Sequence, residues 1–150
     1  VGSQGLGLPD LYIEQEIVHI SKLVQYGSTQ TITGQLLQCC VEQHKLEVGM
    51  VGHLLCLPFD RFGGLTTNSW VKDTWAFAWE HQLEIWDNCM EFVLAWKGDE
   101  FLMEIFDGKK IQGGELCQIN RCCLFLRALR VSDIVEVNGE YILKSCWEGK

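Results

Sequence analysis

The chain has 150 residues, of which 47% are hydrophobic and 21% charged, a composition typical of a folded globular protein rather than a disordered one. Its formal net charge of −8 argues against a free-standing nucleic-acid-binding protein, although a local basic strip is compatible with it. The sequence contains no apolar run approaching the ~18 residues of a membrane span and no signal-peptide pattern, so we expect no membrane contact.

The cysteines predict an intracellular protein with reduced, buried thiols. There are two vicinal pairs and no CxxC motif, which fits neither a disulfide framework nor a zinc ribbon. Cys40 and His44 could share a helical face, but two further zinc ligands are not evident, so no metal site is predicted. The eight positions are Cys39, Cys40, Cys56, Cys89, Cys117, Cys122, Cys123 and Cys146.

Helical periodicity predicts two N-terminal helices, over residues 10–25 and 34–48. Pro9 and Asp10 open the first, and Gly27 ends it. Thr33 is the expected cap of the second, and Gly49 its end. The residues expected to face the core are Leu11, Ile13, Ile17, Ile20 and Val24 in the first helix, and Leu36, Leu37, Cys40, Val41 and Val48 in the second.

A turn-rich connection follows over residues 50–65, and Gly63-Gly64 is the best internal boundary. It divides the chain into a thumb-like helical hairpin with its connection, residues 1–62, and a Trp-rich linker segment, residues 63–150. One continuous domain is the alternative.

A third helix, expected over residues 69–82 and capped by Thr67 or Asn68, is rich in tryptophan. Val71, Trp75, Ala78 and Trp79 form its expected core face. Exposed tryptophans could stack on bases, but acidic neighbours such as Glu80 favour a core role. The tryptophans considered are Trp70, Trp75, Trp79, Trp86 and Trp96.

The C-terminal third predicts a short helix over 99–108, capped by Asp99 and ended by Gly108, and a longer one over 114–128. The longer helix should turn Leu116, Ile119, Cys123 and Leu126 inward. Alternation around Asn138-Gly139 predicts a β-hairpin. The predicted fold class is therefore mainly α, a helical bundle-like segment of about five helices with a small C-terminal β-hairpin.

The residues predict no catalytic site and no cofactor. The acidic pair Asp99-Glu100 suits a helix N-terminus better than a two-metal centre. His53 precedes Cys56 by three residues, but no glycine elbow or oxyanion hole surrounds them, so a thiol-dependent enzyme is the weakest hypothesis.

One basic cluster is a candidate phosphate-binding strip, with a solvated helix face as the alternative. Arg127 and Arg130 would lie one helical turn apart. The strip comprises Lys109, Lys110, Arg121, Arg127 and Arg130.

Four segments suggest a family. GLGLPDLYIEQEIVHI, residues 5–20, resembles the segment that follows the polymerase core in non-LTR retrotransposon reverse transcriptases. TITGQLL, SWVKDTWAFAWEHQLEI and LCQINRCCLFLRALRVSDI are similar, in that order, to later segments of long retroelement reading frames. The resemblance covers about residues 5 to 135, and the order of the segments carries it. Ser3-Gln4 departs from the family, which usually has a further glycine there.

The resemblance implies a helical thumb and linker segment of an RNA-directed DNA polymerase, which supports the RNA template and DNA primer. The paired catalytic aspartates and their Mg²⁺ would belong to a polymerase palm upstream of residue 1, so no residue here is assigned as catalytic. The alternative is an independent helical interaction module whose Trp-rich helix docks a protein partner.

Overall fold

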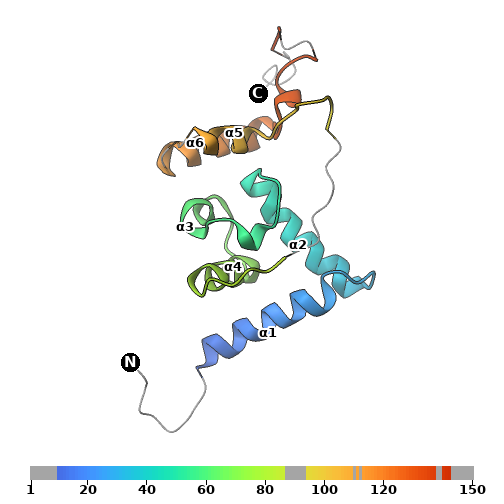
Figure 1. Ribbon diagram of the computed structural model, residues 1–150, viewed down its shortest axis with the longest axis vertical. Coiled ribbons are helices and arrows are strands. Elements are labelled where there is room, and N and C mark those ends of the chain that lie inside the picture. Colours follow the sequence, from blue (N-terminus) through green and yellow to red (C-terminus); the bar gives the residue numbers. More distant parts are fainter. Residues whose placement is uncertain (1–9, 87–93, 110, 112, 138–139, 143–150) are drawn as a thin grey trace.

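The computed structural model describes residues 10–86, 94–109, 111, 113–137 and 140–142. Within these residues the chain is mainly helical. Figure 1 shows α1 toward one end of the arrangement and α5 and α6 toward the other, with α3 and α4 between them. The six α-helices are α1 (Leu11–Tyr26), α2 (Ile32–Val48), α3 (Phe59–Phe62), α4 (Trp70–Glu80), α5 (Leu102–Gly108) and α6 (Gly113–Leu126).

The first two helices lie within two residues of their predicted bounds because their ends have strong capping signals. Asp10 caps α1, accepting a 2.9 Å hydrogen bond from the Tyr12 amide. Thr31, rather than the expected Thr33, caps α2. Gly49 ends α2 in the left-handed region, with φ at 72°, a conformation that glycine adopts without strain.

The connection after α2 folds into short helical pieces instead of plain turns. They are the 3-10 turn Leu54–Cys56, α3 and the 3-10 turn Gly63–Leu65. Through them Leu54, Leu55 and Phe62 enter the main core. The indole nitrogen of Trp75 donates to the carbonyl of Leu57 over 2.8 Å, which ties this connection to α4.

The main core joins the second helix, the connection, α4 and the C-terminal helices. Trp75 at its centre has its ring perpendicular to that of Phe59, with centroids 5.1 Å apart. The buried members of this core are Val41, Val48, Leu54, Leu55, Phe62, Val71, Trp75, Ala78, Ile85, Met103 and Leu116.

The caps and faces of α4 and α5 differ in part from expectation. Ser69 caps α4, accepting from the Lys72 amide, so neither Thr67 nor Asn68 does. Val71, Trp75 and Ala78 are buried as predicted, but Trp79 is 43% exposed. Phe101, not Asp99, stands at the N-cap position of α5 and makes no side-chain cap bond, while the Asp99 carboxylate accepts from the Ser132 amide.

The predicted C-terminal β-hairpin is wrong. Its turn, Asn138-Gly139, lies outside the described residues. Among the flanking residues that are described, no β-strand forms, and Val135 and Ile142 make only an isolated antiparallel bridge. Val137 is 78% exposed, so the apolar residues of this segment find little surface to pack on. A two-stranded ribbon without such packing is marginal in water.

The orientation of α1 also contradicts the predicted core face. Glu16, which is 0% exposed, faces α4, while Ile17 and Val24 are 47% and 68% exposed. Ile20 and Leu23 alone among the aliphatic residues of α1 pack against the main core. An apolar stripe made of Ile13, Ile17 and Val24, spaced as on one side of a helix, is therefore uncovered. We call it the α1 stripe.

Candidate functional site

Arg127 and Arg130 of the predicted basic strip do not lie on one helix. Helix α6 ends at Leu126, and Arg127 has φ at 56°, in the left-handed region. The Ala128 amide donates to the carbonyl of Cys123 and the Arg127 amide to that of Leu124, the two bonds of a Schellman cap. The chain therefore changes direction between Arg127 and Arg130, and the expectation that they lie one helical turn apart is wrong.

The strip residues differ in how freely they face solvent. Lys109, Arg121 and Arg127 are exposed, and Lys110 lies outside the described residues. Arg130 is half-buried, with its guanidinium 5.3 Å from the centroid of the Phe101 ring. Arg121 and Arg127 are thus better placed to meet phosphates than Arg130.

Arg130 also acts on the buried carboxylate of Asp99. Burial raises the pKa of Asp99. Hydrogen bonds from the Ser132 hydroxyl and amide and from the Ala95 amide outweigh burial, with help from the charge of Arg130. The pKa of Asp99 therefore lies below 3.8. The Ser132 amide lies 3.0 Å from Oδ1. Asp99 therefore joins the segment before α5 to the segment after α6.

A second polar network, not anticipated from the sequence, lies between α2 and α4. The buried His44 has Nδ1 3.0 Å from Glu47 Oε2 and Nε2 2.5 Å from Ser69 Oγ. The amide and hydroxyl of Thr67 both donate to the Glu47 carboxylate over 2.9 Å. Burial raises the pKa of Glu47, but the hydrogen bonds from Thr67, His44 and Gln43 outweigh it and lower that pKa below 4.5.

Ser69, His44 and Glu47 have the residue types and the order of a hydrolase triad, but their contacts are structural. The Ser69 hydroxyl oxygen also accepts the Lys72 amide at the start of α4. Ser69 lines neither of the two clefts described below. The network therefore fixes where α4 begins relative to α2. The spacing of three residues between His44 and Glu47 is typical of a contact within a helix. No sequence pattern indicates the contact of His44 with Ser69, which lies 25 residues away.

The weaker cysteine hypotheses gain no support from the geometry. Both ring nitrogens of His44 are engaged, so His44 does not offer a free nitrogen to a metal beside Cys40. The Cys56 thiol donates to the carbonyl of Ile85, and the His53 ring lies against Trp86. In the described ranges no group of three or more His, Cys, Asp or Glu side chains is placed to hold a metal ion.

The expectation of buried thiols is largely wrong for the cysteines that are described. Cys39, Cys56 and Cys122 are exposed, and Cys123 is buried. Cys89 and Cys146 lie outside the described residues. Burial raises the pKa of the Cys123 thiol, with a further contribution from Cys122 beside it. The six described cysteines form no disulfide with one another.

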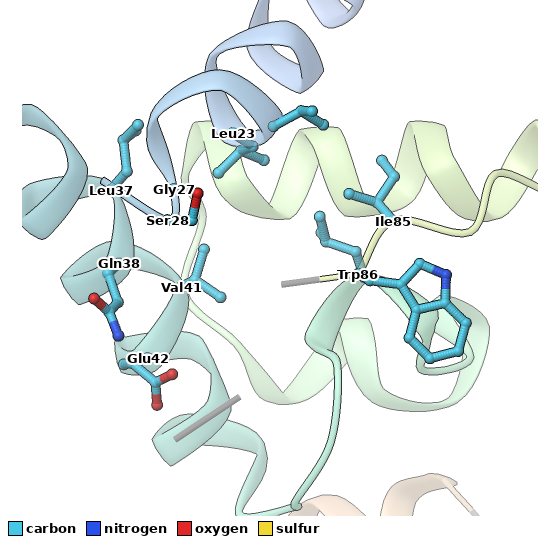
Figure 2. Close-up of a pocket in the computed structure, with 11 residues that line it drawn as sticks. Leu23, Gly27, Ser28, Leu37, Gln38, Val41, Glu42, Ile85 and Trp86 are labelled. Carbon is cyan, nitrogen blue, oxygen red and sulfur yellow. The ribbon is translucent and has the colours of Figure 1, made fainter. Parts of the chain in front are cut away.

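An apolar hollow of about 190 Å³ separates the C-terminal half of α1 from α2. Figure 2 shows Leu23 of α1, Val41 of α2 and Ile85, which follows α4, around it. Val24, the last member of the α1 stripe, also lines it. The uncovered stripe and this hollow are thus continuous through Val24.

Helix α2 carries a second uncovered apolar row. This row consists of four exposed residues, spaced four, three and seven positions apart: Ile32, Leu36, Cys39 and Leu46. The opposite face, with Val41 and Val48, packs into the core. An α-helix that is apolar on both sides is normally covered on both sides.

None of the helices in the described part combines the length and the hydrophobicity needed to cross a membrane. Comparison with known proteins finds no matching family model, no matching curated protein and no matching solved structure.

Proposed function

We propose that this chain is a non-catalytic helical scaffold of a retrotransposon-type reverse transcriptase, the thumb and linker segment downstream of the polymerase core. The GLGLPDL resemblance, which leads into α1, supports the proposal. The observation that carries it is the uncovered apolar surface of α1 and α2. Exposed apolar rows of this size are typical of surfaces that bind another folded unit.

In this proposal the α1 stripe packs against the polymerase core. Helix α1 is held to α4 through the buried pair Glu16 and Thr74, and its exposed aliphatic residues, such as Ile17 and Val24, are left for the second contact. The chain would then order the domains around the active site and help hold the template and primer. The working compartment would be intracellular, which free thiols favour.

The catalytic metal of such a polymerase is Mg²⁺ held by palm aspartates, and this chain has no matching motif. Lys109, Arg121 and Arg127 are the residues that would meet template–primer phosphates, and their small number limits the affinity of the chain by itself. The role is support for nucleic acid bound mainly elsewhere in the parent protein.

The gene tests this assignment directly. Sequencing of the reading frame upstream of the Val1 codon should reveal a palm with its paired aspartates, directly before the GLGLPDL segment. An upstream frame that is closed by a stop codon, or that encodes an unrelated domain, would overturn the assignment.

A second candidate function, a protein-interaction module, is favoured by one specific observation. Trp79 and Trp86 are exposed and line the same cleft. The two functions would use adjoining surfaces, because Leu55 and Trp86 line both this cleft and the hollow beside the α1 stripe.

A further inference from the structure

A cleft of about 590 Å³ opens between the 3-10 turn Leu54–Cys56 and the end of α4. This volume is within the range of sites that bind small molecules or single side chains. We call it the Trp79–Trp86 cleft. It is lined by Leu55, Cys56, Ala78, Trp79, Glu80, Gln82, Leu83, Glu84 and Trp86.

Two indoles give the cleft aromatic walls. Trp79 comes from the last turn of α4, and Trp86, which is 70% exposed, from the segment that follows it. The His53 ring meets Trp86 edge-on with centroids 4.8 Å apart, which limits the rotation of the indole. The face of an indole attracts cations more strongly than that of any other aromatic side chain.

The charged lining residues of the cleft are all acidic. Glu80 and Glu84 are exposed, and in the part of the chain that the structure describes neither forms an ion pair. No lysine or arginine is among the residues that line it. The Coulomb potential of the two carboxylates and the quadrupoles of the two indoles therefore favour the same kind of ligand, a cation.

We propose that the Trp79–Trp86 cleft binds an arginine side chain of a basic segment in a protein partner. A guanidinium is planar and weakly hydrated, so it can stack on an indole while its N–H groups donate to a carboxylate. This combination matches the lining of the cleft better than a phosphate or a nucleobase stack, since both carboxylates would repel a phosphate backbone. The site does not depend on the scaffold role, and it stands if the parent is not a polymerase.

The experiment titrates the full chain with a capped arginine–glycine heptapeptide and follows the indole N–H resonances by NMR. The matched control peptide carries citrulline, an uncharged isostere, in place of each arginine. We expect the resonances of Trp79 and Trp86 to shift with the arginine peptide while the buried Trp75 stays unchanged. The citrulline peptide should bind at least tenfold more weakly.

Variants separate this site from general attraction to an acidic chain. Trp86→Ala should weaken binding by about three- to thirty-fold, and Glu84→Gln by about two- to five-fold. Glu115→Gln, which removes an equal charge from the exposed start of α6, should leave the affinity unchanged. Three results would overturn the proposal: equal binding of the citrulline peptide, unchanged affinity of Trp86→Ala, or a larger shift of the same indoles by single-stranded oligonucleotide.

Discussion

The hydroxyl of Thr74 donates a 2.8 Å hydrogen bond to Oε2 of Glu16, and both side chains are fully buried between α4 and α1. The second carboxylate oxygen, Oε1, has no hydrogen-bond partner among the described residues. A buried polar pair thus holds a helix most of whose aliphatic residues face outward, with Ile20 and Leu23 packed on the core. This inversion is the main reason to expect a further partner for α1.

The Glu16–Thr74 pair predicts opposite effects of single and double substitution. Thr74→Val should lower the free energy of unfolding by about 1–3 kcal/mol, because it leaves the carboxylate with one partner fewer. Glu16→Met combined with Thr74→Val removes both polar groups. The free energy of unfolding of this double variant should exceed that of Thr74→Val and also that of the wild type. Urea denaturation of the wild type and the three variants measures the cycle. A double variant no more stable than Thr74→Val would contradict the account.

Gly34 should resist substitution although it lies inside α2. A Cβ at this position would lie 2.5 Å from the Tyr26 carbonyl oxygen and would also overlap the Thr29 carbonyl oxygen. Gly34→Ala should therefore destabilise by about 1–3 kcal/mol despite the better helix propensity of alanine. Gly114→Ala in the first turn of α6, with no atom within 4 Å, is the matched control and should stabilise by up to about 1 kcal/mol. Thermal unfolding of the two variants measures these effects. Equal shifts in Tm would contradict the close contact between Gly34 and the turn before α2.

The lowered pKa values of Asp99 and Glu47 predict loss of stability in acid. Each carboxylate is stabilised in its charged form by the fold, so its contribution is complete above the unfolded pKa of about 4. That contribution is lost as the pH falls through the lower folded pKa. The urea midpoint should thus stay level from pH 7 to about pH 5 and decrease below about pH 4.

The Asp99→Asn variant isolates one of these two groups. It should be less stable than the wild type at pH 7 by about 1–3 kcal/mol, and the difference should shrink as the pH falls below 4. A difference that stays constant down to pH 2.5 would show that the charge of Asp99 plays no part.

The exposed arginines predict weak, salt-dependent binding to an RNA–DNA hybrid. With three to five phosphate contacts, the slope of log affinity against log salt should be about −0.9 per contact, and affinity should be no better than micromolar. Arg121→Ala with Arg127→Ala should reduce both quantities and leave the fold intact, since both side chains are exposed. Fluorescence anisotropy at low salt measures the affinity and its salt dependence. Unchanged binding by the double variant would show that these arginines face solvent without contacting phosphates.

Sequence reasoning located the helices better than their faces. Asp10 and Gly49 mark helix ends through local backbone chemistry, which a sequence displays directly. Helical periodicity predicted an apolar side of α1. Periodicity does not show whether that side packs inside this chain or against another protein. Glu16 faces inward because Thr74, far along the sequence, supplies a donor.

The candidate sites show the same limit. Arg127 and Arg130 were expected one helical turn apart, but the Schellman cap at Arg127 ends α6 before Arg130. The Asn138-Gly139 pair predicted a hairpin because these residues favour a tight turn. Residues beside the turn, such as Val137, are exposed and do not stabilise the strands by packing. Trp79 and Trp86 line a cleft together with Leu55 and Cys56, which come from the connection between α2 and α4. The sequence does not show that this connection lies beside the end of α4.

The most direct test of the scaffold proposal is primer extension by the longer polymerase that the proposal predicts, carrying changes in the α1 stripe. Ile17→Glu with Val24→Glu places two charges on the stripe, while Gln15→Glu with Gln25→Glu places two on exposed positions of the same helix outside it. We expect the stripe variant to lose most of its template–primer affinity and extension, and the control to retain both. Equal extension by the two variants would contradict the claim that this surface of α1 packs against a polymerase core.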